Sequence, residues 1–217
     1  MLSNKKHVFW EAFFLAVLFV LLGLVLGIYL EQLRTDNTNI SFYQSETSLY
    51  DSFALGKLLE NPYVSCEDLK LANVNFANQI YDEARYLEKY EDSSKLTDSL
   101  KIIHRKYDVL RTLLWMNVIS LEGKCGEINT VVYLYNYSSE DVEIKSRQTV
   151  WSRTLQDLKE NEGDNLILIP IAADQDIVSL NYLLRTYGVR DSPAVLINEK
   201  VVLYEIHSAE EIKDYLR

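Results

Sequence analysis

A run of 19 uncharged, mostly apolar residues from Ala12 to Leu30 is the feature that most constrains this chain. Its length is close to the ~20 residues that a helix needs to cross a bilayer. A cleaved secretory signal usually has a shorter apolar core that ends at small residues, and residues 27–31 (Gly-Ile-Tyr-Leu-Glu) offer no such site. We therefore expect a single-pass membrane anchor at residues 12–30 behind a tail of residues 1–11. A cleaved signal and a buried core helix are the alternatives.

The basic residues around this run predict its orientation. Lys5 and Lys6 precede it, whereas only Arg34 follows it closely. Because cytoplasmic flanks carry the excess of lysine and arginine, we expect the tail in the cytoplasm and the remaining chain outside the cell membrane. Two glycosylation sequons, at Asn39 and Asn136, would then lie outside, although two matches are near the number expected by chance.

Two glycines within the run raise the possibility of a homodimer. Gly23 and Gly27 have the small-xxx-small spacing that lets two membrane helices approach closely. The alternative is that glycine is simply common in membrane helices. Both explanations stay open at this point.

Charge and motifs exclude several classes of function. The net charge of −10 argues against a nucleic-acid partner, because binding phosphates requires clustered lysine and arginine. The sequence has no glycine-rich phosphate loop and no His-Glu-x-x-His motif, and its three histidines are scattered. We therefore expect neither a metal site nor a cofactor.

Residues 31–126 are predicted to form an extracytosolic helical stalk and hairpin. Residues 37–39 (Asn-Thr-Asn) are poor helix formers and mark the expected break after the anchor. A helix then runs from Ile40 to Asn61-Pro62, and its apolar stripe should pack against a domain. The stripe comprises Ile40, Tyr43, Thr47, Tyr50, Ala54 and Leu58, with Phe42, Leu49 and Phe53 beside it.

The next two helices are predicted to pair antiparallel, since only a short polar turn separates them. The first starts after the N-cap Ser65 and ends near Tyr90, and the second ends at Gly123. His104, among Lys101, Arg105 and Lys106, is expected on the solvated face and not as a metal ligand. The packing face of the first helix is predicted to comprise Leu69, Phe76, Ile80 and Leu87. The packing face of the second helix has coiled-coil spacing and comprises Leu96, Leu100, Ile103, Tyr107, Leu110, Leu114, Asn117 and Leu121.

Two cysteines bracket this hairpin. Cys66 begins its first helix and Cys125 follows its second, so antiparallel pairing brings them together. In an extracytosolic chain this placement predicts a structural disulfide. The alternatives are two unrelated thiols, or an exchangeable pair in which the helix N-terminus activates Cys66.

From Ile128 onward the periodicity changes to that of an α/β domain. The expected strands span residues 130–135, 165–171, 194–197 and 201–204, and the expected helices span 142–160 and 177–187. A capping box at Ser208 opens a final helix. A βαβ crossover followed by a helix, a hairpin and a helix predicts a four-stranded mixed sheet with helices on both faces.

This order, together with residues 187–193 (Tyr-Gly-Val-Arg-Asp-Ser-Pro), resembles the thioredoxin-like superfamily over residues 127–217. The resemblance implies a thioredoxin-like domain in which Pro193 is a cis-proline beside the active site. A second explanation is that Pro193 only sets the entry to the strand that follows. The arrangement of anchor and helices resembles that of uncharacterised archaeal membrane proteins.

The residues that give this family its redox chemistry are missing. Its members carry a Cys-x-x-Cys at the N-terminus of the first helix, where the helix dipole stabilises a thiolate. The corresponding residues 136–142 contain no cysteine. Ser138 or Ser139 could occupy the nucleophile position, but a hydroxyl has no thiol redox chemistry and no partner base is evident. We therefore predict no catalytic residue.

The resemblance also implies a polypeptide-binding surface, which can persist without the cysteines. Ser192 and Pro193 would form it, flanked by Tyr137, Ser138 and Ser139. The leading hypothesis is a membrane-anchored, extracytosolic, redox-inactive interaction module. The alternatives are a thiol–disulfide oxidoreductase that uses Cys66 and Cys125, and a structural spacer in the cell envelope.

Overall fold

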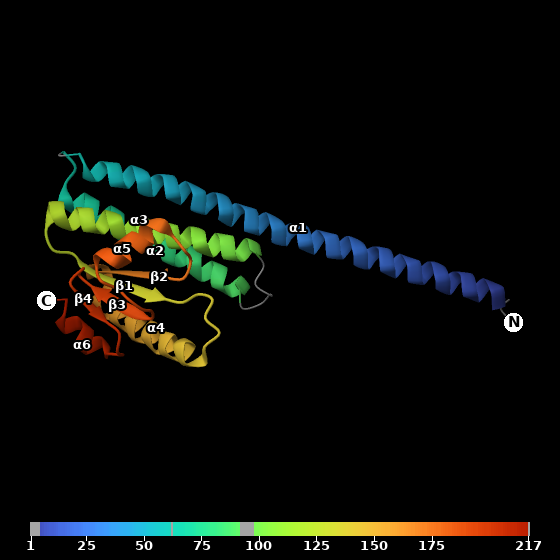
Figure 1. Cartoon of the computed structure of the whole chain (residues 1–217). Coiled ribbons are helices and arrows are strands. Elements are labelled where there is room, and N and C mark those ends of the chain that lie inside the picture. Colours follow the sequence, from blue (N-terminus) through green and yellow to red (C-terminus); the bar gives the residue numbers. More distant parts are fainter. Residues whose placement is uncertain (1–4, 62, 92–97, 217) are drawn as a thin grey trace. The chain divides into compact units, whose positions relative to one another are not determined.

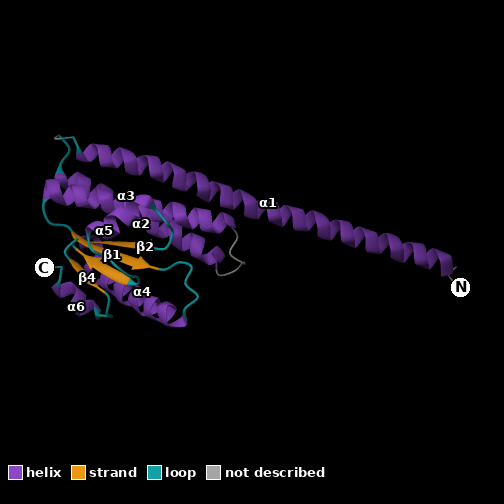
Figure 2. Ribbon diagram, viewed as in Figure 1, coloured by secondary structure: helices purple, strands orange, loops and turns teal. Residues whose placement is uncertain are grey.

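The computed structural model describes the backbone of residues 5–61, 63–91 and 98–216, and the side chains of residues 8–30, 46–61, 63–85 and 101–216 (Figures 1 and 2). The chain divides into two compact units, Met1–Gln44 and Ser45–Arg217. The helices are α1 (Lys5–Leu59), α2 (Cys66–Glu91), α3 (Asp98–Cys125), α4 (Val142–Glu162), α5 (Val178–Thr186) and α6 (Ala209–Asp214), with a short 3₁₀ turn at Gly163–Asn165. The strands are β1 (Asn129–Tyr135), β2 (Leu166–Ala172), β3 (Ala194–Ile197) and β4 (Val201–Leu203).

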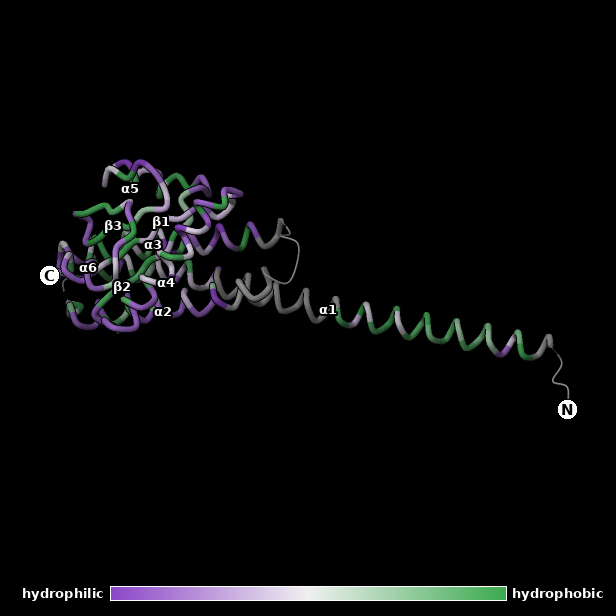
Figure 3. The backbone as a smooth tube through the Cα atoms, turned by 90° about the horizontal axis from the view of Figure 1, so that it is seen from below, coloured by the Kyte–Doolittle hydropathy of each residue, from purple (hydrophilic) through white to green (hydrophobic). Residues whose placement is uncertain are grey.

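In the first unit, the apolar run of residues 12–30 is helical and forms part of α1. Within the described residues one helix is long and apolar enough to span a membrane, and this part of α1 covers Val8–Leu30. The side chains of this span are exposed. Hydrophobic residues, shown in green, make up almost the whole span (Figure 3). Trp10 contacts Phe13 and Phe14 near the start of the span, at ring-centroid distances of 5.9 Å. Aromatic residues of this kind are typical of the membrane–water interface.

The predicted break at residues 37–39 is wrong. Helix α1 includes these residues and ends at Leu59. Asparagine and threonine each cost less than about 1 kcal/mol in a helix interior, far less than proline. No proline or glycine occurs between Ile28 and Leu55, so nothing in this stretch forces the helix to stop.

The predicted packing stripe of the following segment is also wrong where side chains are described. The buried residues are Ser48, Ser52, Leu55 and Leu59, and Leu49 is partly buried. Tyr50, Phe53 and Leu58 are exposed to 67%, 57% and 44%, and Thr47 and Ala54 are exposed as well. The side chains of Ile40, Phe42 and Tyr43 lie outside the described residues. In the second unit, α1 thus turns its serines inward and its aromatic residues outward.

Hydrogen bonds explain this inversion. Gln79 of α2 donates from Nε2 to the hydroxyl of Ser48 at 2.9 Å. Asn117 of α3 donates from Nδ2 to the backbone carbonyl of Ser52 at 3.2 Å. A side chain at Gly56 would come within 2.9 Å of Asn117 Oδ1, so glycine permits close approach here. Buried polar groups with such partners avoid the cost of desolvation.

Helices α2 and α3 form the predicted hairpin. The described members of both predicted faces are buried, from Leu69 to Ile80 and from Ile103 to Leu121. Leu87, Leu96 and Leu100 lie outside the described side chains. Ser65 caps α2 by accepting a hydrogen bond from the Asp68 amide at 3.1 Å. Helix α3 continues past Gly123 to Cys125, and Gly126 (φ +82°) supplies the left-handed residue that ends it.

Cys66 and Cys125 form a disulfide between the two ends of this hairpin, as the sequence predicted. The bridge spans 59 residues of sequence. Beside it lies a small cluster of Leu59, Leu69 and Leu121. The covalent link therefore joins the chain entering α2 to the chain leaving α3.

The four strands form the predicted mixed sheet in the order β2-β1-β3-β4. β1 pairs parallel with β2 and antiparallel with β3, and β3 pairs antiparallel with β4. β2 is an edge strand, which accommodates Pro170 because an edge position needs no donor on its outer side. Two layers of helices cover the sheet: α4 and α6 on one face, and α5 with the α2–α3 hairpin on the other (Figure 1).

The turn between β3 and β4 is anchored on the helical hairpin. Asn198 and Glu199 both adopt positive φ angles (46° and 54°), which glycine or asparagine usually occupies. The Asn198 side chain accepts a hydrogen bond from the Thr130 amide at 2.8 Å. Trp115, fully buried on α3, donates from Nε1 to Glu199 at 2.8 Å. This bond holds the Glu199 carboxylate against the hairpin.

Removing the disulfide should destabilise the second unit. Closing a loop of this length contributes about 4 kcal/mol in the chain-entropy model. We expect the Cys66→Ala/Cys125→Ala variant of the full chain to lose a few kcal/mol, measured by urea unfolding in detergent. Reductant should lower the stability of the wild type to a similar extent. Stoichiometric thiol labelling of unreduced, folded protein would contradict the bridge.

Replacing Glu199 should alter stability in a pH-dependent manner. Burial raises the pKa of Glu199, and the Glu122 carboxylate adds to this effect, while the Trp115 N–H and Lys200 oppose it. The folded state therefore binds this proton more tightly than the unfolded state, and the favourable contribution disappears as pH rises through the folded pKa. Glu199→Gln keeps an acceptor for Trp115 and should raise Tm at pH 7 but not at pH 4. A lower Tm at pH 7 would contradict this account.

Candidate functional site

The parallel strands β1 and β2 end at the same edge of the sheet, where β3 begins. Leu134 lies opposite Ala194, which places the segment before β3 beside the residues that follow β1. In open α/β sheets, ligands bind outside the carboxyl ends of the strands. Three connections meet at this edge: residues 136–141, 173–177 and 191–193. This edge is the candidate site.

One carboxylate ties the first two connections together. The backbone N–H groups of Tyr137 and Ser138 donate to the two oxygens of Asp174 at 2.9 and 2.8 Å. Two adjacent amides directed at one acidic group are the arrangement with which proteins bind anions. Here the protein's own side chain occupies it. Tyr137 and Ser138, both predicted site residues, are therefore held in place through their backbone.

The segment before β3 contacts the same connection through side chains. Ser192 Oγ hydrogen-bonds to Asn136 Oδ1. The backbone of Asn136 is fixed in turn by Gln148 of α4, whose side chain accepts from its N–H at 2.9 Å and donates to its carbonyl at 3.1 Å. The Ser192–Pro193 bond is cis, the isomer that the resemblance implies, and Pro193 is buried.

The structure thus brings four of the five predicted binding residues into one connected group around Asn136. The fifth, Ser139, stands one step further along the chain and accepts a hydrogen bond from the Asp141 amide at 3.3 Å. Asn136, Gln148 and Asp174 were not predicted. Their side chains contact residues that are distant in the sequence, and a local sequence pattern cannot predict such contacts.

The N-terminus of α4 is also occupied by a carboxylate. Asp141 is the N-cap, and its side chain accepts from the amides of Glu143 at 2.8 Å and Ile144 at 3.4 Å. These amides and the helix dipole are what stabilises a thiolate at such a position. A second anion would meet the charge of Asp141 and have fewer free donors.

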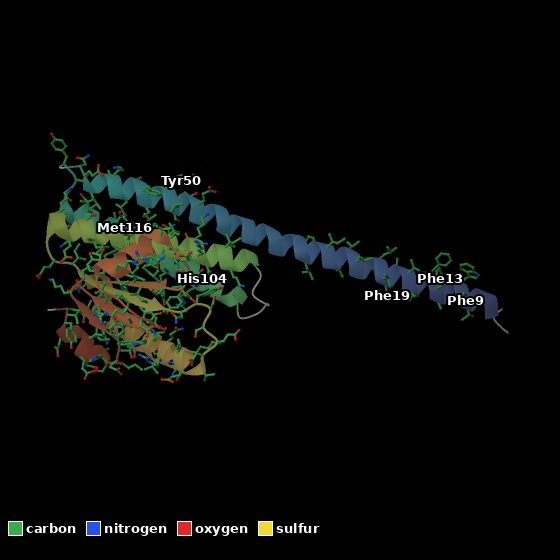
Figure 4. The ribbon with its side chains drawn as sticks, viewed as in Figure 1. Phe9, Phe13, Phe19, Tyr50, His104 and Met116 are labelled. Carbon is green, nitrogen blue, oxygen red and sulfur yellow. A yellow bond between two sulfur atoms is a disulfide. The ribbon has the colours of Figure 1, made fainter. Side chains whose placement is uncertain are left out.

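The expectation that His104 lies on a solvated face is wrong. Its side chain, labelled in Figure 4, is only 12% exposed. Its ring stacks on that of Tyr137 at a centroid distance of 3.8 Å. Nε2 lies 3.2 Å from the Tyr135 hydroxyl, and Nδ1 lies 3.0 Å from a carboxylate oxygen of Asp108. The basic neighbours suggested exposure, but His104 shares a helix face with Asp108 and the buried Arg111. The spacing of four residues from His104 to Asp108 and three from Asp108 to Arg111 could have predicted that His104 lies on this buried face.

Asp108 is the centre of the contact between α3 and this edge of the sheet. Its fully buried carboxylate accepts from Arg111 Nη1 at 3.2 Å and from the amide of Ala172, the last residue of β2, at 3.2 Å. Burial alone would lower the pKa of Arg111, but Tyr135 and Asp108 outweigh it, so the pKa is raised and the guanidinium stays charged. The Asp108 carboxylate thus links α3 to the end of β2 through the Ala172 amide, while Arg111 of the same helix balances its charge.

The contacts that connect the candidate site are hydrogen bonds between its three connections. Across the described part of the chain, no group of three or more histidine, cysteine, aspartate or glutamate side chains could hold a metal ion. The disulfide lies at the far end of α3: Cys125 follows His104 by 21 helical residues, or about 30 Å of rise. The cysteines and the candidate site are thus separate features.

The chain matches no protein-family model and resembles no curated protein in sequence. The site must therefore be interpreted from its own geometry.

Breaking the Asp108 pair should be costly. Asp108→Asn keeps the shape but leaves the buried Arg111 charge without its counter-ion, a change that typically costs about 3–5 kcal/mol. We expect a loss of this order in the free energy of unfolding. Asp157→Asn, an exposed change on α4, is the control and should have little effect. A loss no larger than that of the control would show that Asp108 is not needed to balance the buried Arg111 charge.

Proposed function

We propose that this protein is a membrane-anchored, extracytosolic thioredoxin-like module that binds polypeptide and does not catalyse thiol–disulfide exchange. The anchor is the apolar part of α1, and the binding site is the sheet edge around Asn136.

The topology supports the family. A parallel β1–β2 pair with α4 as its crossover, an antiparallel β3–β4 hairpin and a final α6 reproduce the order that the resemblance implies. Helices α4 and α6 share one face of the sheet, and α5 lies on the other. Fold alone does not determine activity, because one fold supports many functions.

One observation carries the non-catalytic part: carboxylates occupy the amides at which a reactive thiolate would be stabilised. Asp141 takes those at the start of α4, and Asp174 takes those of Tyr137 and Ser138. Electropositive surroundings are what lower a thiol pKa and make the sulfur reactive. Two carboxylates at this position would raise the pKa of a thiol and make its sulfur less reactive.

The binding part depends on the backbone before β3. An extended peptide can pair with such a segment and gain main-chain hydrogen bonds. The Ser192 N–H now donates to the exposed side chain of Asp191 at 2.8 Å, a local bond that an incoming carbonyl can replace at small net cost. Tyr137, with its ring held on His104, would supply rigid contact area beside the peptide.

Binding to a defined extended probe tests the proposal. The full chain in nanodiscs is titrated with a reduced, carboxymethylated model polypeptide, and disulfide reductase activity is assayed in parallel. We expect saturable binding that Pro193→Ala weakens several-fold by changing the backbone at the site, with no reductase turnover above background. Exposed Tyr182 on α5 supplies the control Tyr182→Ala, which should bind like the wild type.

Several outcomes would contradict the proposal. Appreciable reductase turnover would reject the non-catalytic assignment. Unchanged binding by folded Pro193→Ala would remove Pro193 from the site. Protection of the α/β part from protease added outside intact cells would reject the extracytosolic location, independently of any binding result.

A further inference from the structure

We propose that the outward face of α1 in the second unit is a contact surface for a second copy of this chain. The outer α1 face consists of Tyr50, Phe53, Ala54 and Leu58. These residues follow the three- and four-residue spacing that places side chains along one side of a helix. Tyr50 is labelled on α1 in Figure 4.

The polarity of this helix segment is the first argument. Its inner side buries Leu55 and Leu59 together with Ser48 and Ser52, while its aromatic residues Tyr50 and Phe53 remain 67% and 57% exposed. A surface helix normally directs its large apolar side chains to the core and polar ones to water. Large apolar side chains left in water forgo the free energy that burial would give. This helix therefore has its larger apolar side chains available for an outside contact.

The outer α1 face is too small for a stable interface between soluble proteins, which favours a partner in the same membrane. Stable interfaces between soluble proteins bury about 1,200–2,000 Å² in total, more than three large side chains and an alanine on each partner provide. Confinement raises the effective concentration of a partner, as a linker does, so a small contact suffices between molecules held together in another way. The apolar part of α1 provides this confinement for two copies in one membrane, both entering it in the same direction.

Charge favours the same surface. Two copies that each carry a net charge of −10 repel at most approaches. Two charged residues lie on the same side of the helix: exposed Asp51, three residues before Ala54, and Lys57, four residues after Phe53, which pairs with Glu60 at 2.8 Å. Charges of both signs are therefore present here, so two parallel copies meet less repulsion at this surface than their net charge alone would cause. Such an isologous contact is the usual form of a homodimer.

Gly23 and Gly27 offer a separate contact within the span. Both lie where an added Cβ would meet nothing within 4 Å. A dimer could depend on these glycines alone, so the experiment must distinguish them from the outer α1 face.

Cysteine crosslinking of the full chain in proteoliposomes tests the proposal. Among the described residues no free cysteine is present, because Cys66 and Cys125 are bonded to each other. We expect Phe53→Cys to form a disulfide-linked dimer at least about tenfold faster than Tyr182→Cys, since contact raises the local thiol concentration. Tyr182 on α5 is the matched control, with 68% exposure. Equal rates at the two positions would overturn the proposal.

Disruption of the face gives an independent readout. Phe53→Asp should shift the protein from dimer to monomer in single-molecule photobleaching, while Tyr182→Asp should leave the dimer intact. Both changes are on the surface, and an unchanged Tm confirms folding. The proposal is overturned if the wild type is monomeric, if only Gly27→Leu abolishes the dimer, or if a photocrosslinker at Phe53 captures a different protein and no second copy.

Discussion

The buried carboxylate of Asp108 is the interaction on which the arrangement of this molecule depends. It neutralises Arg111, faces His104, and accepts the amide of Ala172 at the end of an edge strand. Edge strands present unpaired N–H groups that natural proteins must cover. Here a helix from outside the α/β part supplies the cover. The helical hairpin and the sheet consequently share one hydrophobic core, which includes Leu110 of α3, Val132 of β1 and Ile169 of β2.

The same contact determines the character of the candidate site. His104 is held between Asp108 and Tyr135 and presents its ring to Tyr137, so the connection after β1 rests on α3. Acidic side chains then occupy the backbone donors of this connection and of the start of α4. Amides that are already paired with carboxylates give little stabilisation to a reactive anion.

The side chains of helix α1 have different surroundings in the two units. In the first unit its apolar side chains are exposed along the whole candidate span, as a lipid environment requires. In the second unit, the hydroxyl of Ser48 and the backbone carbonyl of Ser52 accept hydrogen bonds from Gln79 and Asn117 of the hairpin, with a close approach at Gly56. A polar contact of this type adds little net stability per hydrogen bond. It specifies which side of the helix faces inward, and leaves the aromatic side for other contacts.

The sequence by itself determined the elements of this protein: the apolar run, the α2–α3 seam from Ile103 to Leu121, the bonded cysteines and the order of the four strands. The run and the seam follow from periodicity within short stretches of chain, where hydrophobic pattern acts, and the disulfide follows from the antiparallel pairing that a short turn requires. Only the tertiary structure decided which side of α1 is buried, where His104 lies, and how residues around Asn136 connect. In each case a polar residue can be buried only if a distant partner satisfies it. Those partners, Gln79 for Ser48, Tyr135 for His104 and Gln148 for Asn136, are brought close by folding and not by sequence.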